Sequence, residues 1–218
     1  MGFVRKTYFI LSAQLMLTFG FVVIMKLSTP VNDAIMDAWY LFLPCMIVQL
    51  VIWCTLLCCI KVARKTPGNY ILLGLFTLCW TFILGYICSF YDTQDVAVAM
   101  CMTAIVTVTL SAYACFTTTD FTKMCGPFLC WGLLLVICVQ MILSIICMLV
   151  FEYTDTYIPF VEGFCVILYG LYLLIDTQLI VGGGRYKLTI DDYIIGAIII
   201  YMDIIMIFLY LLQMFGGR

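Results

Sequence analysis

Two aspartates stand inside long apolar stretches of this sequence, Asp176 within residues 158–181 and Asp203 within residues 193–215. An ionisable side chain in the hydrocarbon region of a membrane costs roughly 2.5–3.5 kcal/mol on insertion scales, so it marks a candidate functional site. If the two carboxyl groups meet, they titrate as a pair that can hold one proton between them. Asp176 lies toward one end of its stretch and Asp203 near the middle of the other, so the two approach only if the helices are offset or bent.

The stretch that holds Asp176 carries further polar residues on one helical face. Glu162, Tyr169 and Asp176 are spaced by seven, and Tyr172 falls on the same side. At 1.5 Å per residue the two acids are about 21 Å apart, most of the way across a membrane. This stripe predicts a lining for cations or protons. In the alternative, Glu162 lies near the lipid headgroups and the tyrosine hydroxyls bond to neighbouring helices, and for Glu162 by itself we favour that alternative.

The composition is that of an integral membrane protein. Of 218 residues, 66% are hydrophobic and 10% are charged, against about 45–50% and about 25% in a soluble domain. A backbone that faces lipid must satisfy its own hydrogen bonds, so we expect an all-α, polytopic chain that forms one membrane domain over residues 1–218. The sequence has no histidine, which excludes His-dependent proteolysis and His-ligated zinc or haem chemistry, and we do not expect an enzyme.

Seven apolar runs are each long enough to cross a hydrocarbon core about 30 Å thick. We expect the segment between the first two, residues 26–38, to be a loop, and residues 61–69 to be a basic turn. The predicted spans are 7–25, 39–60, 70–90, 96–116, 127–151, 158–181 and 193–215.

The distribution of basic residues predicts the orientation. Eight basic residues fall on the side of the amino terminus and two on the other side, which predicts a cytosolic amino terminus. A seventh segment that re-enters the membrane without crossing it would leave those eight unmoved, so the charge count leaves both topologies open. The eight are Arg5, Lys6, Lys61, Arg64, Lys65, Lys123, Arg185 and Lys187.

Several stretches, in order along nearly the whole chain, resemble the transmembrane Bax-inhibitor-motif family, which includes Bax inhibitors and Lifeguard proteins. The last third is the most similar, and among the branches the chain looks most like the Lifeguard proteins. The stretches are Phe3-Val4-Arg5-Lys6-Thr7-Tyr8, Pro67-Gly68-Asn69, Phe90-Tyr91-Asp92-Thr93, Thr118-Thr119-Asp120-Phe121-Thr122, Ile175-Asp176-Thr177-Gln178, Gly182-Gly183-Gly184-Arg185-Tyr186, Asp191-Asp192-Tyr193 and Tyr201-Met202-Asp203-Ile204-Ile205.

This resemblance implies seven helices with the last one central, and a pH-sensitive cation leak, mainly of Ca²⁺. Asp176 and Asp203 match the paired aspartates that form the pH sensor in such proteins, where Ca²⁺ would bind transiently as the permeant or regulatory ion. Arg64 matches, loosely, a basic residue that latches the pair. Met206 stands where many relatives carry Asn. No cofactor is implied.

Four functions compete for such a chain. The first is a Ca²⁺ leak channel with an anti-apoptotic role in Ca²⁺ homeostasis. The second is a non-conducting membrane scaffold that modulates cell-death or Ca²⁺-release partners. An intramembrane aspartyl protease is disfavoured, because Asp176 follows Ile175 and no proline occurs after Pro159. A seven-helix receptor or light sensor is disfavoured, because the last span holds no lysine for a retinal Schiff base and the sequence lacks the Asn-Pro-x-x-Tyr and Asp-Arg-Tyr receptor motifs. The sequence leaves the membrane open among endoplasmic reticulum, Golgi and plasma membrane.

Overall fold

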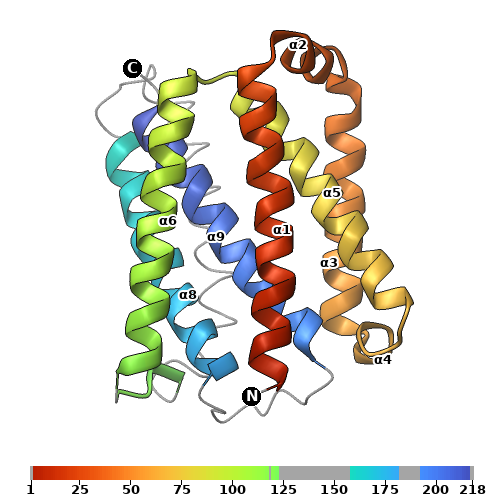
Figure 1. Ribbon diagram of the computed structural model, residues 1–218, viewed down its shortest axis with the longest axis vertical. Coiled ribbons are helices and arrows are strands. Elements are labelled where there is room, and N and C mark those ends of the chain that lie inside the picture. The colour runs from red at the N-terminus through yellow and green to blue at the C-terminus, as the bar shows by residue number, and fades with distance from the viewer. Residues whose placement is uncertain (1, 118, 123–157, 182–191, 217–218) are drawn as a thin grey trace.

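The computed structural model of the chain describes residues 2–117, 119–122, 158–181 and 192–216, and these ranges hold helices and no strand. Six helices or helix pairs have the length and hydropathy to cross a membrane, so the predicted all-α, polytopic membrane fold is confirmed. The predicted span 127–151 lies outside the described residues. The elements are α1 Gly2–Leu27, α2 Thr29–Asp37, the 3₁₀ turn η1 Trp39–Leu41, α3 Phe42–Cys58, α4 Ile60–Ala63, α5 Gly68–Ser89, α6 Thr93–Phe116, α8 Ile158–Val181 and α9 Tyr193–Phe215 (Figure 1).

The loop expected over residues 26–38 is wrong, because α1 runs to Leu27 and Thr29–Asp37 forms α2. Proline is tolerated in a first helical turn, where its missing N–H has no partner to lose, so Pro30 helps α2 begin. Val31 and Ile35 are four residues apart and pack on the core. Likewise, the turn expected over residues 61–69 is partly helical, since α4 continues to Ala63.

Helix α9 lies at the centre of the bundle, as the family resemblance implies. It packs against α8, α6, α1 and α5 and runs obliquely behind α1 in Figure 1. Within its most apolar window 72% of the residues are buried, against 11% for the span at Trp39–Leu56. A helix that is apolar all round belongs in an interior, and Tyr201, Ile205 and Phe208 are fully enclosed.

Hydrogen bonds between α1, α5 and α9 fix the position of the central helix. Gln14 of α1 donates to the Thr77 hydroxyl of α5 at 2.9 Å. One turn further along α1, the Thr18 hydroxyl lies 3.2 Å from the hydroxyl of Thr81 and 2.9 Å from that of Tyr201 in α9. Polar contacts of this kind hold transmembrane helices together where the surrounding lipid provides no hydrophobic drive.

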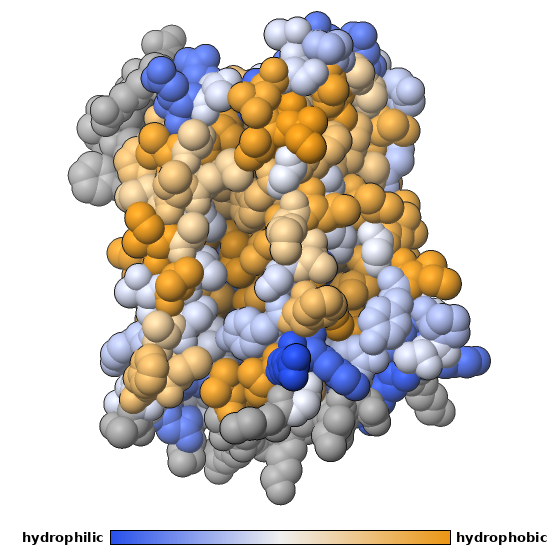
Figure 2. Space-filling model, viewed as in Figure 1, coloured by the Kyte–Doolittle hydropathy of each residue, from blue (hydrophilic) through white to orange (hydrophobic). Residues whose placement is uncertain are grey.

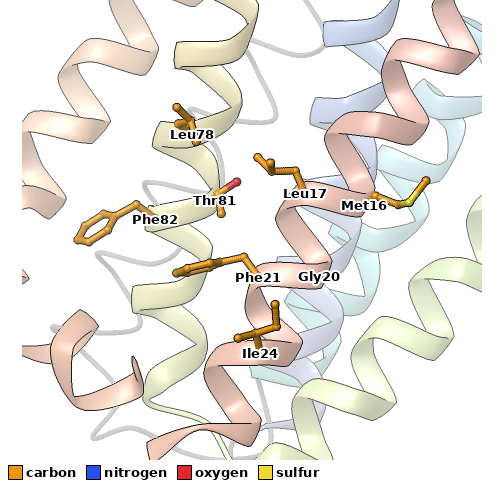
Figure 3. Close-up of a pocket in the computed structure, with 8 residues that line it drawn as sticks. All are labelled: Met16, Leu17, Gly20, Phe21, Ile24, Leu78, Thr81 and Phe82. Atoms are coloured by element: carbon orange, nitrogen blue, oxygen red, sulfur yellow. The ribbon is translucent and has the colours of Figure 1, made fainter. Parts of the chain in front are cut away.

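The outer surface of the bundle suits a bilayer. Figure 2 shows a broad apolar band with hydrophilic residues gathered toward the two ends. Between α1 and α5 a shallow groove of about 510 Å³ opens to this surface (Figure 3). Because its lining holds no charged side chain, we interpret the groove as lipid-facing surface and not as a polar binding site. The lining residues are Met16, Leu17, Gly20, Phe21, Ile24, Leu78, Thr81 and Phe82.

Candidate functional site

Asp176 of α8 and Asp203 of α9 meet inside the bundle. Both side chains are buried, and their carboxyl groups lie within hydrogen-bonding reach of each other. The question that the sequence left open is therefore answered by the packing of α8 against α9. A carboxylate only accepts hydrogen bonds, so two carboxyl groups bond to each other only when one of them holds a proton. This arrangement accommodates one shared proton.

One oxygen of the pair has no hydrogen-bond partner among the described residues. Oδ2 of Asp203 is buried without a donor. Leaving a buried acceptor unsatisfied costs about 1–3 kcal/mol. This oxygen can carry a proton or accept a hydrogen bond.

The Asp176–Asp203 pair supplies few of the ligands that a bound Ca²⁺ takes. Ca²⁺ takes six to eight oxygen ligands in proteins. Within the ranges that the structure describes, no group of three or more acidic or cysteine side chains is close enough to hold a metal ion. Two carboxyl groups supply part of such a shell, and transient binding of Ca²⁺ at the pair stays a prediction.

At the other end of α8, Glu162 bonds to α9. The side chain is 9% exposed, and with the Gln213 amide oriented by its hydrogen-bonding partners, the amide nitrogen donates to the two carboxylate oxygens at 3.1 and 3.3 Å. Gln213 was not among the predicted site residues. A signal for it was present: α8 and α9 run antiparallel, and Gln213 is a rare polar residue in the last turn of α9.

Between these two acid positions lies a layer of tyrosines. The Tyr169 ring is 5.3 Å from the ring of Tyr210 and 6.1 Å from that of Tyr172. The Tyr169 and Tyr210 side chains also hydrogen-bond to each other. The α8–α9 interface thus carries polar groups at three levels, from Glu162 through Tyr169 to Asp176. Whether they line a pathway stays a prediction.

Arg64, the predicted latch, bonds to the start of α9. Its Nε and Nη2 donate to Oδ1 and Oδ2 of Asp192 at 2.8 and 2.9 Å. Asp192 is the N-cap residue of α9, and it is buried while Arg64 is 41% exposed. A guanidinium that grips both oxygens of a carboxylate fixes its orientation. Arg64 therefore holds the helix that carries Asp203, and a latch acting on the pair itself remains a prediction.

Comparison with known proteins agrees with this architecture. The family model described as "Inhibitor of apoptosis-promoting Bax1" matches residues 1–218. The protein lifeguard 3 of Mus musculus is 34% identical over 217 residues, which are 100% of this chain and 69% of that protein. Its Homo sapiens counterpart is 35% identical, with 99% and 68% covered. A BI1-like protein of Arabidopsis thaliana is 30% identical, with 97% and 79% covered.

A family match over the whole length and relatives of this identity agree with the motifs noted in the sequence. They also agree with the six described spans and the central last helix. The chain belongs to the Bax-inhibitor and Lifeguard family of anti-apoptotic, multi-pass membrane proteins.

Proposed function

We propose that the chain is a proton-sensitive leak pathway for Ca²⁺ and other cations, and that it restrains apoptosis by limiting the Ca²⁺ held in an endomembrane store. The observation that carries this proposal is the buried contact between Asp176 and Asp203. Acidic groups within membrane spans commonly mark ion pathways or proton relays.

The proposed gate depends on one proton. While Asp176 and Asp203 share the proton, α8 and α9 stay together, and the proposed ion pathway between them is closed. When the proton leaves, two negative charges face each other in a medium of low dielectric constant, where their repulsion is much stronger than in water. The helices then separate, and an entering cation neutralises the pair. The unbonded Oδ2 of Asp203 provides a first ligand for that cation.

Ca²⁺ entry into liposomes that hold the purified protein tests the proposal. Flux is measured from about pH 6 to pH 8 for the wild type, Asp176→Asn and Asp203→Asn. We expect the wild-type leak to rise with pH as the pair loses its proton, and each substitution to flatten the curve, because an amide cannot lose a proton in this range.

Asp37→Asn is the matched control. Asp37 is exposed on α2, so the same chemical change is made outside the interface of α8 and α9. Its flux curve should follow that of the wild type. If both single substitutions in the pair leave the curve unchanged, the pair is not the gate.

A non-conducting scaffold is the second candidate. It is favoured by the family description, which names the inhibition of an apoptosis-promoting protein and no transport. Its partners would be cell-death or Ca²⁺-release proteins of the same membrane. Protein that is correctly folded yet silent at every pH would replace the leak proposal with this one.

A further inference from the structure

Four exposed basic side chains belong to the two segments that contact the start of α9. Arg5 and Lys6 belong to the first turns of α1, while Arg64 and Lys65 lie in the turn that joins α4 to α5. Figure 2 shows hydrophilic residues along this edge of the molecule, below the apolar band. These segments are far apart in sequence, so the fold creates the cluster.

Contacts with the first residues of α9 join the two halves of this basic cluster. The Lys6 ammonium group lies 5.4 Å from the centroid of the Tyr193 ring. Arg64 bonds to Asp192, the preceding residue. Tyr70, in the first turn of α5, donates its hydroxyl proton to the Tyr193 hydroxyl at 3.0 Å. Cations from α1 and from the α4–α5 turn therefore meet at two adjacent residues.

The basic cluster carries positive charge that no acidic side chain within the described ranges neutralises. In the part of the chain that the structure describes, the ion pair formed by these four residues is the one between Arg64 and Asp192. Arg5 and Lys65 are exposed and have no acidic partner within those same ranges. Exposed cations that outnumber their acidic partners within the described ranges create a positive surface that favours a multivalent anion.

We propose that the basic cluster of Arg5, Lys6, Arg64 and Lys65 binds the headgroup of an anionic phospholipid that carries more than one phosphate. The membrane-spanning helices α1 and α5 both begin here, so the cluster lies where hydrocarbon gives way to headgroups (Figure 1). Clusters of basic residues beside a membrane span attract anionic lipids. Tyr70 is 47% exposed at the same level, in keeping with the preference of tyrosine for the membrane interface.

The orientation predicted from the charge count agrees with this ligand. It places the start of α1 in the cytosol, and the cytosolic leaflet is the one that is rich in anionic lipids. The inference goes beyond the proposed leak, since it concerns lipid binding at the membrane surface and needs no ion flux.

Native mass spectrometry of the protein in a neutral detergent tests the proposal. Dioctanoyl phosphatidylinositol 4,5-bisphosphate and dioctanoyl phosphatidylcholine are titrated separately. We expect the wild type to bind the bisphosphate lipid at least about tenfold more tightly than the zwitterionic one. Arg5→Gln/Lys65→Gln should weaken that binding by roughly tenfold or more, because each basic residue near an anionic surface contributes a severalfold factor.

Lys26→Gln is the matched control, since Lys26 lies at the opposite end of α1 and donates to the carbonyl of Tyr91. It should bind the bisphosphate lipid as the wild type does. Equal binding by the double variant and the wild type, or equal weakening in the control, would overturn the proposal. So would soluble inositol 1,4,5-trisphosphate binding as tightly as the lipid, because the ligand would then be a free phosphate compound. Since the readout is lipid occupancy, these outcomes are separate from those of the flux measurement.

Discussion

The interface between α8 and α9 holds a buried acid toward each of its ends, and the two acids are satisfied in different ways. At one end Glu162 accepts hydrogen bonds from the amide of Gln213. At the other, Asp176 faces a second acid, Asp203. Glu162 and Asp176 have the same exposed fraction, 9%, so solvent exposure of the side chains does not distinguish them.

The partner decides what each acid can do. An amide N–H donates at any pH, so the contact between Glu162 and Gln213 does not depend on a shared proton. The contact between two carboxyl groups does depend on one, and it is lost when that proton leaves. The first contact therefore connects the helices without a shared proton, and the second is the one that the proposed leak would break as pH rises.

The largest expected effect is a failure of additivity in Ca²⁺ flux. Asp176→Asn, Asp203→Asn and the double variant should all lose the pH response to the same extent, because each removes the same shared proton. Combining Glu162→Gln with Asp176→Asn should instead give the sum of the two single effects. Liposome flux at about pH 6 and pH 8 measures both combinations. Independent, additive losses in the two aspartate variants would refute a shared proton.

The second prediction concerns the fixed contact. Gln213→Leu leaves buried Glu162 without its donor and should destabilise the protein by about 1–3 kcal/mol. Thermal unfolding in detergent measures the loss. The double change Glu162→Leu/Gln213→Leu should recover part of it, because an apolar pair leaves no polar group unsatisfied. A double variant less stable than Gln213→Leu would contradict this account.

A third acid, Asp192, extends the comparison to a permanent cation. Arg64→Gln should cost about 1 kcal/mol, because it removes the guanidinium from a buried carboxylate while Arg64 itself is partly exposed and screened by solvent. Chemical unfolding in detergent compares this variant with Lys65→Gln, whose side chain is exposed. Equal losses in the two variants would show that the ion pair contributes nothing.

The smallest expected effect is that of a neutral hydrogen bond in the same helix. Tyr201→Phe removes the hydroxyl that lies 2.9 Å from Thr18 and should cost about 0.6 kcal/mol, a typical value for such bonds between membrane helices. The midpoint of thermal unfolding should fall slightly. Tyr40→Phe, at a side chain that is 62% exposed, should leave the midpoint unchanged. An equal fall in both variants would show that the effect does not come from the hydrogen bond to Thr18.

The order of the spans could be predicted from the sequence because charged turns separate long apolar runs. The predicted bounds 158–181 and 193–215 coincide with those of α8 and α9. Helix α2 was missed because Pro30, Asp33 and Asp37 give the segment the composition of a loop. Its core-facing residues, Val31 and Ile35, are too few to produce a clear apolar stripe.

The residues of the candidate site could be predicted from the sequence, but the contacts between them could not. Asp176 and Asp203 were identifiable because charge is rare in membrane spans. Their meeting depends on how α8 and α9 pack, and helical periodicity does not contain that offset. Arg64 and Asp192 are separated by 128 positions, so their ion pair arises from tertiary packing alone.

Because the start of α9 is held in place, a rotation of the helix about that end would displace residues further along it by larger distances. Lys6, Tyr70 and Arg64, from three separate elements, hold its first residues. At 1.5 Å per residue, Asp203 lies about 15 Å along the helix from Tyr193, and Phe215 lies about 33 Å from it. A tilt of about 4° would then shift Asp203 by about 1 Å, enough to break a hydrogen bond, and the far end of the helix by about twice as much. A small rotation of α9 would thus displace the helix at one face of the membrane while its start at the opposite face stays in place.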